Sequence, residues 1–202
     1  MKTAPSAAPA APRGRPRSFD RDAALERAMQ VFWRKGYEAT SVSDLTRAMD
    51  INPPSLYAAF GDKERLYLEA LERYERDRRA TFMRLLQEAP SARRAIEHLL
   101  TAVARELTHA ECRGCMLSTA QCGDPRLQST LAERRNAPKQ ALKARFDRAV
   151  REGELARGTD TAALAGFYAT VLQGMAVQAR DGASVRSLGA TAKAAMRAWP
   201  KS

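Results

Sequence analysis

The amino-acid sequence predicts an all-α protein of about nine helices. Apolar residues recur about every three or four positions along nearly the whole chain, and glycine or proline separates the successive runs. Alternating apolar and polar residues, which would indicate strands, are nearly absent. With 202 residues, the chain is long enough for a small domain joined to a larger one.

The first predicted helix follows Phe19 in the run "DRDAALERAMQVFWRKG". Its inward face would carry Leu25, Ala28 and Phe32, which recur at helical spacing. Gly36 would end it, because glycine readily adopts the backbone conformation that follows a helix. A second, shorter helix is expected in "TSVSDLTRAM" (residues 40–49), with Thr40 or Ser41 as its N-cap.

A third short helix is predicted from "NPPSLYAAF" (residues 52–60), although two prolines normally break a helix. Asn52 is a favourable N-cap, and proline is tolerated in a first turn, whose N–H groups have no partner within the helix. Leu56 and Phe60 are four residues apart and would share the buried face. The prolines therefore define a sharp helix start.

The remaining pattern predicts longer helices separated by turns. A segment with a turn, a short helix and another turn is expected around residues 111–125. The predicted long helices cover residues 62–88, 91–109, 125–152, 160–182 and 184–199.

The second and third helices, joined by the tight turn at residues 50–52, form a predicted helix-turn-helix, whose second helix enters the DNA major groove by its N-terminal end. The run from Phe19 to Leu71 resembles the N-terminal domain of TetR-family transcriptional regulators. Asp50 stands where the family usually has a glycine, but aspartate tolerates the left-handed conformation. The residues that carry the resemblance are Phe32, Gly36, Tyr37, Thr40, Val42, Leu45, Ile51, Ser55, Leu56, Tyr57, Phe60, Lys63 and Glu64.

The resemblance implies DNA contacts for several of these residues. Tyr57 and Lys63 match the family's phosphate-contacting tyrosine and lysine; the alternatives are an aromatic packed between helices and a solvated lysine. Thr40 and Ser41 lie where a helix N-terminus can hold a phosphate. Ser55 could reach a base edge or a phosphate, whereas Ala58 and Ala59 offer only methyl groups, for example to thymine.

A basic arm precedes this domain. "PRGRPR" (residues 12–17) matches the core of an AT-hook, in which arginines lie along a narrow minor groove. Arg13, Arg15 and Arg17 would make these contacts; the alternative is a solvated basic tail that adds only nonspecific attraction. The expected organisation is a lead-in with this arm (1–17), a helix-turn-helix domain (18–65) and an effector-binding and dimerisation domain (66–202).

The C-terminal half resembles the same family more loosely. The resemblance implies a homodimer through the last two helices, which suits a palindromic operator, and a pocket inside the domain. An apolar lining would imply an apolar or aromatic small-molecule effector. The candidate lining residues, each of which could instead be plain core, are Phe82, Leu86, Leu99, Met116, Phe146, Phe167, Tyr168 and Met175.

Three cysteines lie close together in "HAECRGCMLSTAQC". Cys112, Cys115 and Cys122 could be inert core thiols, reactive sensor thiols with a lowered pKa, or metal ligands together with His109. A single Cys-x-x-Cys pair without a second pair is a weak metal motif. All three interpretations remain open from the sequence.

Composition narrows the functional class. The net charge of +11 and pI of about 10.1 favour a polyanionic partner such as double-stranded DNA. No run of 18 apolar residues and no leader-like start are found, so we expect a cytoplasmic protein without a membrane partner. Motifs of hydrolases, metalloproteases and nucleotide-binding enzymes are absent, and no cofactor is expected. The sequence thus predicts a transcriptional regulator, a repressor released by a small molecule, with thiol or metal sensing as the alternative signal.

Overall fold

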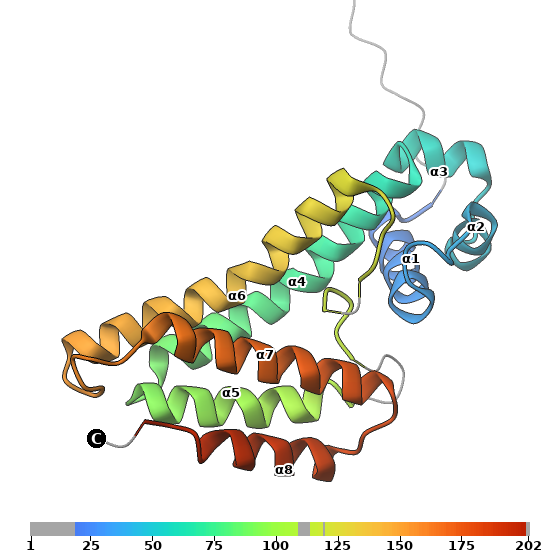
Figure 1. The fold of residues 1–202 in the computed structure, drawn as a ribbon. Helices are drawn as coiled ribbons and strands as arrows, with labels where there is room; N and C mark the ends of the chain where they lie inside the picture. The colour runs from blue at the N-terminus through green and yellow to red at the C-terminus, as the bar shows by residue number, and fades with distance from the viewer. Residues whose placement is uncertain (1–18, 109–113, 119, 201–202) are drawn as a thin grey trace, which may run out of the picture.

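The computed structural model describes residues 19–108, 114–118 and 120–200, which form eight α-helices and no strand (Figure 1). The predicted all-α class is confirmed. The short helix expected near residues 111–125 is not found among the described residues, where positions 116–118 form a turn. The helices are α1 (Arg21–Lys35), α2 (Val42–Met49), α3 (Pro53–Phe60), α4 (Lys63–Glu88), α5 (Ala92–Glu106), α6 (Pro125–Arg151), α7 (Thr161–Arg180) and α8 (Val185–Met196).

Every one of these helices starts at a side chain that accepts hydrogen bonds from the backbone N–H groups of the first turn. Such groups have no partner within the helix, so a short polar side chain at the N-cap stabilises the start and marks its position. The N-caps are Asp20, Ser41, Asn52, Asp62, Ser91, Asp124, Asp160 and Ser184. The helix boundaries therefore follow closely from local chemistry.

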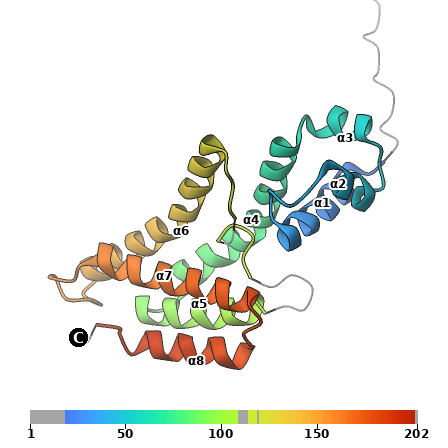
Figure 2. The same ribbon diagram turned by 45° about the vertical axis from the view of Figure 1, so that its right-hand side comes forward.

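The helices α1 to α3 gather at one end of the molecule, and α4 runs from them into the other half (Figures 1 and 2). There α5, α7 and α8 lie beside one another, and α6 packs mainly along α7. The buried apolar residues form two clusters. One lies among α4 to α8, and the other lies among α1 to α4.

The cluster around α1 to α4 also takes residues from much later in the chain. Met116, Leu117 and Ala120 in the segment before α6, and Leu127 and Leu131 in its first turns, are buried there. The expected domain boundary at residue 65 falls in the first turn of α4, whose residues enter both clusters. The two halves are thus joined by α4 and by the segment before α6, which packs back against α1 to α4.

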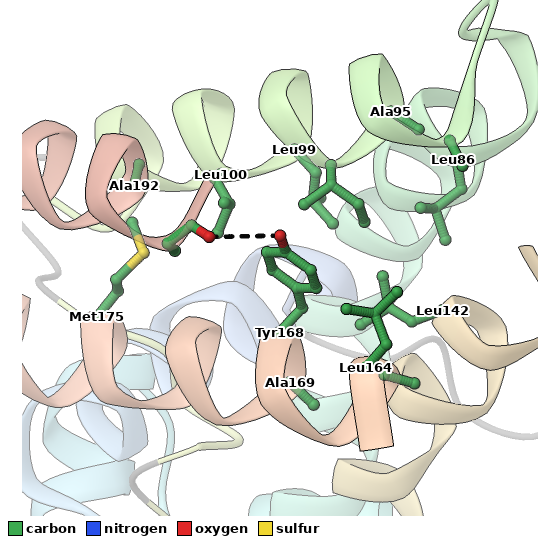
Figure 3. Packing of buried hydrophobic residues seen from close by; sticks show 14 of the residues in the cluster. Leu86, Ala95, Leu99, Leu100, Leu142, Leu164, Tyr168, Ala169, Met175 and Ala192 are labelled. Atoms are coloured by element: carbon green, nitrogen blue, oxygen red, sulfur yellow. Dashed lines mark hydrogen bonds between the residues drawn. The ribbon is translucent and has the colours of Figure 1, made fainter. Parts of the chain in front are cut away.

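Tyr168 of α7 lies at the centre of the larger cluster (Figure 3). It is fully buried, and its hydroxyl donates a hydrogen bond of 3.4 Å to the carbonyl of Ala195 in α8. Burial raises the pKa of Tyr168 to about 12, so the hydroxyl stays protonated as a donor. Its ring lies within about 6 Å of those of Phe146 and Trp199, at 6.1 and 6.0 Å between centroids.

A buried arginine joins three segments at the far end of this half. The guanidinium of Arg145, in α6, donates to the carbonyl of Leu86 at 3.1 Å and to Glu154 at 3.0 Å. The Glu154 carboxylate, in the loop after α6, also accepts from the backbone N–H of Ala92 at the start of α5. Removing the carboxylate would leave a buried charge without its counter-ion.

This geometry predicts acid-sensitive stability. Burial alone would raise the pKa of Glu154, but the hydrogen bonds from Ala92 and Arg145 outweigh it and hold the pKa below its ordinary value. A carboxyl with a depressed pKa stabilises the fold above its unfolded pKa and loses that contribution as pH falls through the folded pKa. Glu154→Gln should therefore lower the free energy of unfolding at neutral pH by about 2 kcal/mol and weaken its dependence on acid pH.

Urea denaturation between neutral pH and pH about 3 would measure both effects. Glu152→Gln is the matched control, because its carboxylate is exposed and pairs with Arg148 at 3.6 Å on the helix surface. That change should cost less than about 0.5 kcal/mol. Equal losses of unfolding free energy in the two variants would contradict the role of Glu154 as the counter-ion of Arg145.

Candidate nucleic-acid interface

The turn between α2 and α3 depends on Asp50. Its φ of 56° and ψ of 48° are left-handed, and it is the only described residue other than glycine with a positive φ. Its backbone N–H donates to the carbonyl of Thr46 and so closes the end of α2. Aspartate is one of the few residues that adopt this conformation at low cost, so it can replace the usual glycine.

The start of α3 is capped as the sequence predicts. The Asn52 carboxamide oxygen accepts a hydrogen bond of 2.8 Å from the backbone N–H of Ser55. Pro53 and Pro54 occupy the first two helical positions, where a missing N–H costs no intrahelical hydrogen bond. The prolines also restrict φ, which sets the direction of the helix before any ligand arrives.

The short helix α3 has two distinct faces. Leu56 and Phe60 are buried in the α1 to α4 cluster, which confirms their predicted shared face. Tyr57 is 49% exposed, Ala58 is exposed, and Ser55 is half-buried. The helix thus presents Tyr57 and Ala58 outward from a fixed base.

Arg21, the first residue of α1, holds the other end of α3. Its guanidinium donates to the carbonyl of Ala59 at 3.3 and 3.4 Å and forms an ion pair of 2.6 Å with Glu69 of α4. It also lies 4.4 Å from the centre of the Phe60 ring. Sequence reasoning did not find this residue, because these partners are distant in the chain and leave no local pattern.

The residues flanking α3 differ in how accessible they are. Lys63 at the start of α4 places its ammonium 4.4 Å from the centre of the Tyr37 ring and is half-buried. Thr40 is 1% exposed, and its hydroxyl donates to the carbonyl of Gly36 at 2.6 Å. The burial of Thr40 argues against a direct contact between its side chain and DNA.

Ser41 is exposed at the start of α2, but that helix N-terminus already faces a carboxylate. Ser41 and Asp44 form a capping box, and Lys35 lies 2.7 Å from Asp44. The lysine and the hydrogen bonds from Ser41 hold the pKa of Asp44 well below its usual range, so it stays ionised. The carboxylate occupies part of the site that a phosphate would use. Arg13, Arg15 and Arg17 lie outside the described residues.

The C-terminal half contains a cavity of about 410 Å³ that is partly open to solvent. It is lined by α4, α5, α6, α7 and the segment before α6. Of the predicted pocket residues, only Phe82 and Leu99 border it. Phe167 is instead 41% exposed on α7. The others are buried away from this cavity: Leu86, Met116, Phe146, Tyr168 and Met175.

The described cysteines lie in different surroundings. Cys115 is half-buried in the cavity wall, where its sulfur accepts from the backbone N–H of Ser118 at 3.4 Å. Burial raises the pKa of the Cys122 thiol, which opposes the thiolate that a sensor needs. Cys112 and His109 are not among the described residues, and the described part of the chain holds no group of three or more potential metal ligands.

The cysteine-bearing segment connects the cavity to the helix-turn-helix. Cys115 and Ser118 border the cavity, while the neighbouring Met116 and Leu117 are buried against α1 to α4. Further along, the backbone N–H of Gly123 donates to the Glu38 carboxylate, in the turn between α1 and α2, at 2.7 Å. A change in the cavity wall therefore has a direct path along the chain to the half that contains the helix-turn-helix.

Known proteins with similar sequences also contain a helix-turn-helix. Residues 24–70 match the family described as "Bacterial regulatory proteins, tetR family". The chain is 36% identical over 197 residues to the HTH-type transcriptional repressor ComR of Escherichia coli K12, covering 94% of this chain and 93% of that one. It is 32% identical to the repressor BdcR of the same organism, covering 89% and 88% of the two chains.

A solved structure extends this similarity to three dimensions. It contains a cysteine variant of the TetR-family transcriptional regulator CifR in complex with 26-base-pair double-strand operator DNA. The two chains are 44% identical and superpose with a TM-score of 0.88, over 93% of this chain and all of that one.

The capped start of α3 gives a test of the local structure. Asn52→Ala should lower the free energy of unfolding by about 1 kcal/mol, because the N–H of Ser55 loses its acceptor. Urea denaturation measures this change. Asn136→Ala, at an exposed position within α6, is the control and should leave stability unchanged or slightly higher, since alanine favours helix interiors. An equal effect of the two changes would remove the capping role of Asn52.

Proposed function

We propose how this member of the TetR family works: it binds a palindromic operator as a homodimer, and a small molecule bound in its C-terminal half releases it from that DNA. Membership of the family makes the chain a DNA-binding transcriptional repressor and not an enzyme. The observation that carries this proposal is the combination of an outward face on the capped helix α3 with a cavity, partly open to solvent, in the other half. We infer that the protein acts in the cytoplasm, as expected for a DNA-binding regulator similar to ComR and BdcR of Escherichia coli.

We assign the DNA contacts to residues around the exposed face of α3. Tyr57 and Lys63 would bind phosphates, and Ser55 and Ala58 would meet base edges or the backbone. The similar regulator CifR has been solved in complex with operator DNA, which supports DNA binding by this chain. The arm with Arg13, Arg15 and Arg17 would follow the adjacent minor groove, in the way that homeodomain arms do.

Side-chain readout of bases would be sparse. The helix α3 contains no arginine, glutamine or lysine, and Ala58 offers only a methyl group to the major groove. Specificity would then depend more on the shape and deformability of the operator, with phosphate contacts fixing the position of the protein. Affinity of this kind falls steeply as salt concentration rises.

The phenolic hydroxyl of Tyr57 provides a direct test. Tyr57→Phe removes one phosphate-binding group from a half-exposed ring and should lower operator affinity about tenfold without altering the fold. Fluorescence anisotropy with an operator selected from genomic fragments by the wild-type protein would measure this. Arg157→Ala, at an exposed position in the loop after α6, is the control and should bind as the wild type does. Unchanged affinity of Tyr57→Phe would contradict the assignment.

The dimer interface would use the outer faces of α7 and α8. Along α7 one exposed stripe recurs at helical spacing and is apolar or small: Ala163, Phe167, Thr170, Gly174 and Val177. On α8, Val185, Ala190 and Ala194 are exposed and also lack charge. Small residues allow close approach of helices, and an apolar stripe of this length favours burial against a second copy.

The composition of α7 agrees with this role. It is the one helix of the described residues that is long and apolar enough, by length and composition alone, to cross a membrane. One of its faces nevertheless packs in the core through Leu164, Tyr168 and Met175. A core face together with an interface face would account for apolar residues around most of the helix.

A charge in the stripe should separate the subunits. Val177→Asp changes a side chain that is 47% exposed in the monomer, so the fold should tolerate it, whereas a dimer would have to bury the carboxylate. We expect the dimer dissociation constant to rise at least about 100-fold, which corresponds to about 3 kcal/mol. Sedimentation equilibrium measures this constant. The control is Ala162→Asp, exposed on another side of α7; a wild-type constant for Val177→Asp would exclude this interface.

Release by a small molecule would use the link between the cavity and the helix-turn-helix. A ligand that alters the wall at Cys115 and Ser118 would shift the segment that ends at Gly123, which is hydrogen-bonded to Glu38. A coupling of about 1 to 3 kcal/mol between the sites would change operator affinity roughly 5- to 150-fold. Thiol chemistry at Cys115, which borders the same cavity, is the alternative signal on this scaffold.

A further inference from the structure

The cavity has a charged end and an apolar end. On α4, Tyr74, Glu75 and Arg78 border it on the side toward the helix-turn-helix, and Phe82 and Leu85 border it further along. Two ion pairs mark the charged end. Arg78 lies 2.7 Å from Glu106 of α5, and Arg134 of α6 lies 2.6 Å from Glu75.

The charged end carries an excess of positive charge. Its wall contains four arginines, at positions 78, 79, 134 and 135, and two glutamates. Each glutamate is already paired with one arginine, so neither carboxylate is available to hold a cationic ligand. Among the described residues, Arg79 and Arg135 form no ion pair. This end of the cavity wall therefore carries two more positive than negative charges, and Arg79 and Arg135 are the arginines without a carboxylate partner in the described part of the chain.

Arg135 is the better placed of these two. It is half-buried, whereas Arg79 is exposed, and its Nη1 donates to the carbonyl of Ala120 at 3.2 Å, which orients the guanidinium. A guanidinium has five N–H donors in a planar fork, so most of them are left for a ligand. A carboxylate can accept two of them at once.

The opposite end of the cavity is lined by hydrocarbon. Phe82 and Leu85 of α4, Leu99 and Val103 of α5, and Leu172 of α7 border it. Such a lining favours an apolar body and offers few partners for additional polar groups. The volume of about 410 Å³ is near the lower end of the range for small-molecule sites, which suits a ligand with a short apolar body.

We propose that the effector is a small amphipathic carboxylate, such as an aryl-alkanoic acid, whose carboxylate pairs with Arg135 and whose apolar body fills the space beside Phe82 and Leu99. The inference rests on the proposed role of this cavity as the effector site. It specifies the ligand more narrowly than an apolar lining alone, since a neutral molecule would leave the positive excess unpaired. A cation would face the same excess directly.

The test compares two probes of nearly equal shape, 4-phenylbutyrate and 4-phenylbutanamide. Isothermal titration calorimetry with the full-length protein, without DNA, measures each affinity. We expect the carboxylate to bind at least about tenfold more tightly, because a charge-assisted hydrogen bond to arginine is stronger than a neutral one. Arg135→Met should abolish this preference while keeping the apolar stem. Arg126→Met, exposed outside the cavity on the same helix, should keep the preference.

Arg135→Lys gives a second reading if the methionine variant is unstable. It retains the charge but not the planar fork, so its preference for the carboxylate should fall between those of the wild type and Arg135→Met. Equal or tighter binding of the amide overturns the proposal. So does the failure of both probes to bind the wild-type protein at millimolar concentration, or an equal effect of Arg126→Met.

Operator release is measured separately, by anisotropy with each probe. If the carboxylate binds through Arg135 without releasing DNA, the proposed class of ligand is supported, but the proposal that this cavity controls operator release is overturned. If 4-phenylbutanamide releases DNA and the carboxylate does not bind, control of operator release by the cavity is supported, but the proposal of a carboxylate ligand is overturned. The two proposals therefore fail in distinguishable ways.

Discussion

The burial of α4 in two separate cores is the constraint on which the rest of this structure depends. Near its start, Leu66, Tyr67 and Leu71 pack with α1 to α3, and near its end Leu86 packs with α5 to α8. A helix whose two ends are both buried transmits a displacement at one end to the other, because close-packed interiors deform little. The position of α3 relative to the cavity is thus set by one rigid element.

The segment before α6 provides a second connection between the cavity and the helix-turn-helix, so α4 is not the sole link between them. It borders the cavity at Cys115, fills the smaller core at Met116 and Leu117, and reaches the turn after α1 through Gly123. A ligand that displaced α4 alone would have to break these contacts. Both connections must have more than one stable arrangement for a signal to pass between the sites.

Local chemistry was sufficient to predict where the helices begin and end, but not how they pack against one another. Asn52, Pro53 and Pro54 define the start of α3 because a cap and its prolines interact only with their own turn. Arg21 and most of the cavity lining could not be predicted, since both depend on partners brought together by the packing of distant helices. Of the predicted lining residues, only Phe82 and Leu99 border the cavity. Phe167 and Tyr168 show the same limit: α7 is apolar on several sides, so periodicity did not tell which ring is buried and which is exposed.

The contribution of Leu127 and Leu131 to the smaller core bears on how such proteins can be recombined. A fragment that ended shortly after α4 would leave the apolar surface that these leucines cover open to water, and it would tend to associate or lose its packing. The DNA-reading half is therefore not a transferable module with a single cut site. A hybrid with another regulator would need two junctions, one within α4 and one within α6, and matched side chains along both.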